Sequence, residues 1–129
     1  LASSRDRGAL LDKVPASNVS ARHVELYNSF LALVACFHRQ SRNVAFYAKE
    51  MGIGEKYLRT ITNSITGKSP KQVLADYLMR EIERSLMSTT MTVQEVAYHY
   101  GFQSQSLFSK YFFQQRGCSP SDFRNSHSV

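Results

Sequence analysis

The stretch TVQEVAYHYGFQSQSLFSKYFFQQRGCSPSDFR, residues 92–124, decides the fold. Thr92 and Glu95 form the S/T-x-x-E pattern of a capping box, in which each side chain satisfies the other residue's backbone N–H at a helix start. Gly101 stands where a helix ends in a left-handed residue, a conformation that glycine adopts without a Cβ penalty. Ser104 is placed to cap a second helix. The stretch therefore predicts two short helices on either side of a tight turn.

Apolar residues recur at helical spacing through both of these helices. The inward faces that we expect are Val93, Val96, Ala97 and Tyr100 in the first, and Leu107, Phe108, Tyr111 and Phe112 in the second. Gly117 ends the second helix, and Ser119, Pro120 and Asp122 begin a third. Two helices joined by a short turn that contains glycine form the helix-turn-helix pattern, whose second helix enters the major groove of DNA.

The composition limits the class of protein. The 129 residues suffice for one domain or two very small ones, and the net charge of +6 favours an anionic partner, with nucleic acid first. Cys36 and Cys118 both lie in apolar helical patterns, which indicates a reducing cytoplasm rather than a disulfide framework. No apolar run approaches the roughly 20 residues that a membrane-spanning helix requires.

The N-terminal part contains one long helical pattern. Residues 1–19 have a mixed, charged composition and weak periodicity, so we expect a linker or tail, with a short helix near residues 9–14. Because the chain begins with Leu1 rather than Met, we expect it to be a fragment of something longer. A helix follows over residues 20–40. Its apolar face is Leu26, Phe30, Leu33, Val34 and Phe37. His23 and His38 on this helix are predicted to be exposed or half-buried rather than metal ligands, because no Cys, Asp or Glu stands at ligand spacing beside them.

Three more helices complete the pattern. Asn43 caps a helix that ends at Gly52, and Glu55 opens another that ends at Gly67. The expected inward face of the latter is Tyr57, Leu58, Ile61 and Ile65. A capping box over residues 69–72 starts a long helix to Ser88, with the apolar face Val73, Leu74, Tyr77, Leu78, Ile82, Leu86 and Met87, while Met51, Met79 and Met91 also read as packing residues. The chain is therefore predicted to be all-α, with about seven helices.

An internal repeat divides the chain into two units. Residues 43–53 align with residues 92–102 at an offset of 49, and residues 58–70 align with 108–120 at an offset of 50, so the second copy has an extra turn residue near Gln103. We therefore expect a first helix-turn-helix unit over residues 20–68, a linker helix over 69–88 and a second unit over 92–124. The linker is about 28 Å long at 1.5 Å per residue, close to the ~34 Å between successive major-groove segments. One chain would then read two adjacent segments of the groove.

The paired units resemble the DNA-binding domain of the AraC/XylS family of bacterial transcription regulators, which would occupy residues 20–129. The family pattern I-A-x-x-x-G-F-x-x-x-S-x-F-x-x-x-F-[KR]-x-x-x-G-x-[ST]-P-x-x-[YF]-R is matched in register by Val96-Ala97, Gly101-Phe102, Ser106, Phe108, Phe112, Gly117, Ser119-Pro120 and Phe123-Arg124. The first unit matches more loosely. Phe113 stands where the family usually has Lys or Arg, and residues 62–64 (Thr-Asn-Ser) replace the usual Phe-Lys-Lys of the first unit. Both departures remove positive charge near the DNA, and Thr62 places a smaller side chain in the hydrophobic core of the first unit. The resemblance implies two homeodomain-like subdomains.

The outward faces of the two second helices supply the candidate DNA-binding residues. These are Lys56, Arg59, Thr60 and Asn63 in the first unit, and Gln105, Ser106, Ser109 and Lys110 in the second. Arg59 suits bidentate bonding to guanine and Gln105 to adenine, while Lys56 and Lys110 fit either guanine or phosphate. Ser41, Arg42, Thr92 and Ser104 lie near helix starts and are candidate phosphate contacts. Phe102, Phe108 and Phe112 are expected in the core, and Arg124 is expected to bond within the fold.

More than one class of function is compatible with a basic, all-helical chain. The resemblance implies sequence-specific DNA binding in the cytoplasm, at the bacterial nucleoid, with RNA polymerase as a further partner and an upstream sensing or dimerisation domain; activation and repression both stay open. An enzyme is not expected, because no catalytic constellation or phosphate loop appears, and no cofactor or metal is implied. The alternatives are a DNA-targeting module of a larger repair enzyme and a helical protein-interaction module, although the latter leaves the repeat and the basic charge unexplained.

Overall fold

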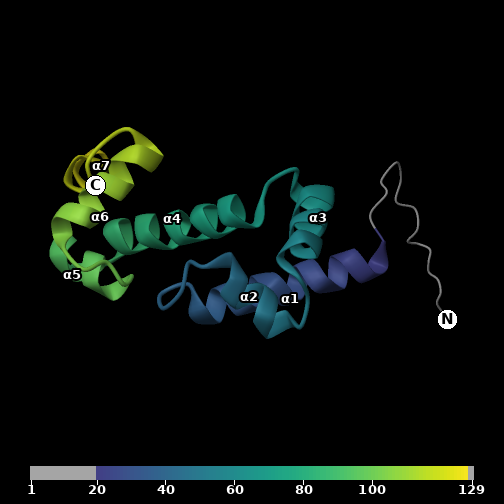
Figure 1. The fold of residues 1–129 in the computed structure, drawn as a ribbon. Coiled ribbons are helices and arrows are strands. Elements are labelled where there is room, and N and C mark those ends of the chain that lie inside the picture. Colours follow the sequence, from purple (N-terminus) through teal and green to yellow (C-terminus); the bar gives the residue numbers. More distant parts are fainter. Residues whose placement is uncertain (1–19, 128–129) are drawn as a thin grey trace.

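The computed structural model describes residues 20–127, which form seven helices and no strand (Figure 1). The helices are α1 (Ala21–Phe37), α2 (Val44–Met51), α3 (Glu55–Thr66), α4 (Pro70–Ser88), α5 (Val93–His99), α6 (Gln105–Arg116) and α7 (Pro120–Ser126). The first unit comprises α1 to α3 and the second comprises α5 to α7, with α4 between them. The predicted all-α class is confirmed. The tail and the short helix expected within residues 1–19 lie outside the described residues.

Local capping explains where the helices begin. Asn43 Oδ1 accepts a hydrogen bond from the backbone N–H of Ala45 at 2.9 Å, which starts α2. At α5 both bonds of the predicted capping box are present, from Glu95 N–H to Thr92 Oγ1 (3.0 Å) and from Thr92 N–H to Glu95 Oε1 (2.8 Å). Such caps satisfy backbone donors that the helix itself leaves unpaired.

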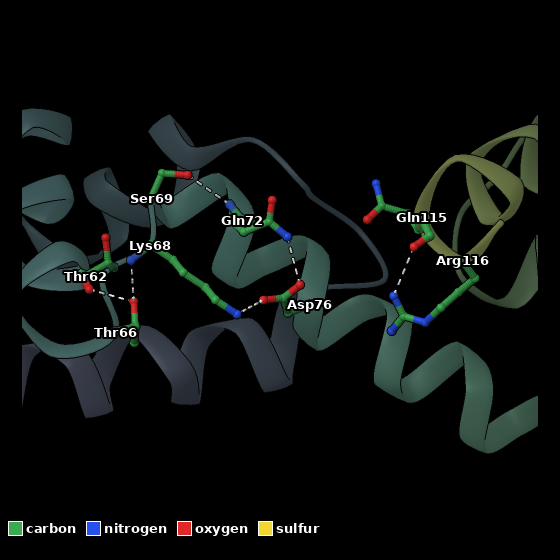
Figure 2. Close-up of polar contacts among 8 residues, drawn as sticks. All are labelled: Thr62, Thr66, Lys68, Ser69, Gln72, Asp76, Gln115 and Arg116. Carbon is green, nitrogen blue, oxygen red and sulfur yellow. Dashed lines mark hydrogen bonds and ion pairs between the residues drawn. The ribbon is translucent and has the colours of Figure 1, made fainter.

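The capping box predicted at the start of α4 is only half correct. Ser69 Oγ accepts from the backbone N–H of Gln72 at 3.2 Å, as expected. The side chain of Gln72 does not return to the cap, because its Nε2 donates to Asp76 Oδ1 at 2.8 Å, one turn further along the helix. Figure 2 shows both bonds. The carboxylate of Asp76 is the stronger acceptor and lies on the same helix face at the i+4 position.

The two turns confirm the internal repeat. Ile53 N–H donates to Ala48 O at 3.0 Å, and Phe102 N–H donates to Ala97 O at 3.0 Å, so equivalent bonds close both turns at an offset of 49. Helices α3 and α6 have 12 residues each and begin 50 positions apart. The extra residue of the second unit therefore lies between Phe102 and the start of α6, as the sequence predicts.

Each end of α4 belongs to a different hydrophobic core (Figure 1). Val73 and Leu74 pack with α1 to α3, whereas the later residues of α4 pack with α5 to α7. The second group from α4 is Leu78, Met79, Ile82 and Leu86. Because each buried aliphatic side chain contributes about 1.5–3 kcal/mol, α4 is a structural part of both units rather than a spacer.

Most expected core residues are buried or half-buried, but three are exposed. Phe108 and Phe112 are fully buried and Phe102 is 8% exposed, as predicted. Three residues assigned to inward faces are exposed: Tyr57 (40%), Leu107 (51%) and Met87 (51%). Each stands next in sequence to a fully or almost fully buried residue, and one step along a helix rotates the side chain by ~100°. These three residues therefore lie at the edge of the apolar stripe and not at its centre.

His38 and Cys118 also differ from expectation. His38 is only 8% exposed, with its Nδ1 2.9 Å from Val34 O and its ring centroid 5.2 Å from that of Tyr77. Cys36 is exposed on α1, and Cys118 lies half-buried in the turn before α7 rather than in a helix; both are free thiols. His38 is therefore part of the packing beside α4. Within residues 20–127, no helix combines the length and apolarity needed to cross a membrane.

Candidate nucleic-acid interface

Helix α3 exposes all four candidate residues of the first unit. Leu58, Ile61 and Thr62 turn the opposite face of this helix into the core. The exposed candidates are Lys56, Arg59, Thr60 and Asn63. The hydroxyl of Thr60 donates to Lys56 O at 3.2 Å within the helix. The charged end of Arg59 carries the strongest hydrogen-bonding capacity on this face, because a guanidinium presents five donors.

Helix α6 presents the equivalent surface in the second unit. Gln105, Ser106 and Lys110 are exposed, whereas Ser109 is half-buried at the edge of the helix. Phe113 is 57% exposed on the same face. Only Lys110 among these residues is charged, so the second unit offers a more neutral surface than the first.

Three of the candidate phosphate contacts have structural roles of their own. Thr92 and Ser104 cap α5 and α6 through their side-chain oxygens, and Ser41 Oγ accepts from the backbone N–H of Asn43 at 3.2 Å. In each bond the hydroxyl oxygen is the acceptor. A hydroxyl group also has one hydrogen to donate, so a cap of this kind is compatible with donation to a phosphate oxygen.

Arg42 connects the two units. Its Nη1 donates to Tyr100 O at 3.2 Å, and its guanidinium carbon lies 4.5 Å from the centroid of the Phe102 ring. Arg39 in the same loop donates from Nε to His99 O at 2.9 Å. The loop between α1 and α2 thus docks on the end of α5, and we call these contacts the inter-unit contact (Figure 1). The sequence did not reveal Arg39, because no local pattern connects residues about 60 positions apart.

The inter-unit contact requires glycine at position 101. Gly101 has a φ of +84°, which confirms the left-handed residue predicted there. A Cβ atom at this position would lie 2.6 Å from the backbone oxygen of Arg39. At Gly52, the equivalent position in the first unit, no atom lies within 4 Å of such a Cβ. Of these two turns, only the one at Gly101 brings the backbones of the two units close together.

The pKa of His99, which lies in this contact, is below its ordinary value. Burial is the largest cause, followed by the positive charge of Arg39 and by His38. Both effects oppose protonation of the imidazole. Protonation of the His99 side chain is therefore less favourable in the folded chain than in the unfolded one.

A groove separates the first turns of α4 from α6. It has a volume of about 430 Å³ and is lined by Arg42, Ser69, Lys71, Gln72, Ala75, Tyr111 and Gln115. Figure 2 shows Gln72 and Gln115 on its two sides. A neighbouring groove reaches α3 and is lined by Val44, Glu55, Arg59, Ser69, Pro70 and Lys71. Lys71 lines both grooves. The sequence analysis did not select this residue, because its position after Pro70 does not show which side of α4 it occupies.

Two helix-turn-helix units that share one connecting helix define a tandem helix-turn-helix protein. A family profile described as "Helix-turn-helix domain" matches residues 47–126, which is more than half of the chain. The chain belongs to the AraC-type helix-turn-helix family of DNA-binding transcription regulators.

Arg124, which matches the end of the family pattern, donates from Nε to Leu86 O at 2.8 Å and so bonds within the fold as predicted.

The curated relatives are longer regulators. The HTH-type transcriptional regulator ExsA of Pseudomonas aeruginosa is 26% identical over 118 residues, which cover 92% of this chain and 41% of that protein. The uncharacterized regulator YobQ of Bacillus subtilis is 38% identical over 60 residues, 46% of this chain and 25% of that protein. The chain thus spans about two fifths or less of the length of these relatives.

Solved structures share the fold. The C-terminal domain of AraT, a response regulator from Geobacillus stearothermophilus, has a TM-score of 0.72 at 21% identity, with 88% of this chain and 91% of that chain covered. The DNA-binding domain of AdpA, a global transcriptional factor solved in complex with a target DNA, has a TM-score of 0.68 at 25% identity, with coverage of 79% and 91%.

Proposed function

We propose that this chain binds double-stranded DNA sequence-specifically by placing α3 and α6 in successive major-groove segments of one duplex. The observation that carries the proposal is the inter-unit contact, in which Arg39 and Arg42 bond to backbone oxygens of the other unit. This contact and the shared helix α4 hold two recognition helices in one arrangement. A single chain with that property reads two segments without dimerising.

The proposed base contacts are the exposed polar side chains of the two recognition helices. They are Lys56, Arg59, Thr60 and Asn63 on α3, and Gln105, Ser106, Ser109 and Lys110 on α6. Ser41, Thr92 and Ser104 are proposed to donate to phosphates from their capping positions. Arg42 is proposed to have two roles, because its guanidinium holds the inter-unit contact and also lines the groove beside α4.

The biological setting follows from the family and the relatives. We propose that the chain is the DNA-binding part of a longer bacterial regulator in the cytoplasm, associated with the nucleoid, with RNA polymerase as a second partner. The likeness to AdpA, which was solved with a target DNA, supports the DNA-binding role. The coverage of only 41% of ExsA is consistent with a further domain upstream.

A salt titration tests this proposal. Fluorescence anisotropy of the chain with a random duplex and with a duplex enriched by repeated selection should show preferential binding to the enriched one. Both affinities should fall as salt rises, with a slope of about 0.9 in log K per phosphate neutralised. An affinity that is independent of salt, or no preference after selection, would refute the proposal.

A further inference from the structure

We propose that the groove lined by Lys71 and Arg42 is a phosphate-binding site for the DNA backbone that runs between the two major-groove segments. This inference rests on the proposed function and adds a site to it. Lys71 is on α4, on neither of the two recognition helices, and is not among the residues that the sequence pattern selects. The site would contribute affinity and register, and no base specificity.

The first reason is position. The two grooves beside α4 share Ser69 and Lys71 as a common wall. One groove extends to Arg59 on α3, and the other extends to Tyr111 and Gln115 on α6. The hollowed surface therefore runs from one recognition helix to the other across the first turn of α4. In the proposed arrangement, the backbone between the segment read by α3 and the segment read by α6 crosses this surface.

The second reason is the orientation of the two units. Arg59 follows the buried Leu58 by one residue, whereas Tyr111 precedes the buried Phe112 by one residue. Because each residue along a helix rotates the side chain by ~100°, Arg59 and Tyr111 lie on opposite sides of the buried faces of α3 and α6. The grooved surface therefore contacts opposite edges of these two equivalent helices. When two identical units follow each other in the same direction along a duplex, one edge of the first recognition helix faces the opposite edge of the second. When two units are related by a two-fold axis, the same edge of each recognition helix faces its partner.

The third reason is uncompensated positive charge. Lys71 is exposed and forms no ion pair with any residue in the described part of the chain. Arg42 bonds to a neutral carbonyl oxygen and an aromatic ring, so its charge is oriented but not neutralised. The carboxylate of Asp76 on α4 is instead held by Lys68 at 2.8 Å (Figure 2). Glu55, at the α3 end of the surface, lies in the same groove as Arg59.

The fourth reason is the chemistry of the remaining lining. Gln72 and Gln115 bring side-chain amides to the two sides of the groove, and Tyr111 and Ser69 bring hydroxyl groups. Amides, hydroxyls and flexible ammonium groups are the donors that proteins use toward phosphate oxygens. A groove with two cations and neutral donors therefore suits an anionic DNA backbone better than an apolar or basic partner.

The test compares Lys71→Ala with Lys68→Ala in the enriched and random duplexes used for the salt titration. Both variants remove one positive charge at nearly the same place in the sequence, but Lys68 lies in a different groove, with Tyr27, Leu31 and Asp76. Lys71→Ala should weaken binding to both duplexes by a similar factor and lower the salt slope by about 0.9. Lys68→Ala should lower the slope less, and Lys71→Arg should restore it. Thermal unfolding of each variant controls for stability.

A duplex with neutral methylphosphonate linkages between the two contacted segments provides the second readout. Neutral linkages should weaken binding of the native chain and should have little further effect on Lys71→Ala. Equal slopes for Lys71→Ala and Lys68→Ala, or equal losses for the native chain and Lys71→Ala on the neutral linkages, would overturn this site while DNA binding stands. Absence of DNA binding by the native chain would overturn the proposed function and this site together.

Discussion

Gly101 and Gly52 occupy equivalent turns but carry different constraints. Both have positive φ values, +84° and +73°, so any residue with a side chain is strained at either position. Only at Gly101 does a backbone oxygen of the other unit, that of Arg39, stand 2.6 Å from the site of a Cβ. The sequence predicts the first constraint from the helix-ending position, whereas the second arises from a contact distant in the chain.

Gly101→Ala should therefore destabilise the chain more than Gly52→Ala. The left-handed conformation costs about 1–2 kcal/mol for a residue with a Cβ, and this cost applies to both variants. Gly101→Ala also forces the two backbones apart, which adds an overpacking cost of about 1–3 kcal/mol. Chemical unfolding measures both free energies. Equal losses in the two variants would show that the close approach at Gly101 has no energetic role.

Arg59 tests base reading at the level of a single side chain. Arg59→Ala should cost about 1–3 kcal/mol on the enriched duplex and should remove the preference for one base pair in one half of the site. Arg84→Ala is the matched control, because Arg84 is an exposed arginine on α4 that pairs with Glu81 at 3.3 Å. Competition with single-base variants of the duplex measures the preference. Uniform weakening on every sequence would assign Arg59 to a phosphate instead.

Burial at single positions was predictable only in part. Periodicity placed Phe108 and Phe112 correctly, because they lie at the centre of an apolar stripe. It failed for Leu107 and Tyr57, since an apolar residue at the edge of a stripe looks the same in sequence whether or not another helix covers it. Ring contact with His23 at 5.9 Å accounts for the position of Tyr57 beside α1. Thr62 is buried as expected, with its hydroxyl bonded to Arg59 O.

At the scale of elements, capping residues and glycines located the helices well. Ser, Thr and Asn caps and left-handed glycines act within one turn of the chain, so their effects are visible in sequence. The loop between α1 and α2 was not predictable in the same way. Its roles depend on bonds from Arg39 and Arg42 to the end of α5, and on the buried ring of His38. For the same reason, the sequence did not predict the groove beside α4 or the position of Lys71 in its lining.

The inter-unit contact should be sensitive to acid through His99. Its pKa is lowered in the folded chain by burial and by Arg39 and His38, whereas an unfolded histidine titrates near pH 6.5. The unfolded chain then binds the proton more readily, so the contribution of His99 is present above about pH 6.5 and is lost as the pH falls toward the folded pKa. The unfolding temperature should decline across this range, and less steeply in His99→Gln.

The control for this prediction is His23→Gln, which removes an imidazole from α1 outside the inter-unit contact. An equally shallow decline in both variants would show that the loss of an imidazole in general, and not the position of His99, changes the pH dependence. If His99→Gln retains the full decline between about pH 7.5 and 5.5, the acid sensitivity originates elsewhere in the molecule and His99 does not couple the two units to pH.

At the level of the whole molecule, α4 and the inter-unit contact hold the two repeated units in one arrangement. The sequence predicted the repeat and the length of the linker, because both are patterns along the chain. It did not predict how the units sit against each other, which depends on the docked loop and on α4 contributing to both cores. We propose that this arrangement allows a single chain to read two successive segments of the major groove.

Methylation-interference footprinting of the enriched duplex, combined with the stoichiometry of the complex from analytical ultracentrifugation, tests that claim most directly. We expect two contacted patches in the major groove, centred about 10–10.5 base pairs apart on one face of the duplex, in a complex of one chain per duplex. A single patch in the complex with one chain, or two patches only when two chains are bound, would contradict it.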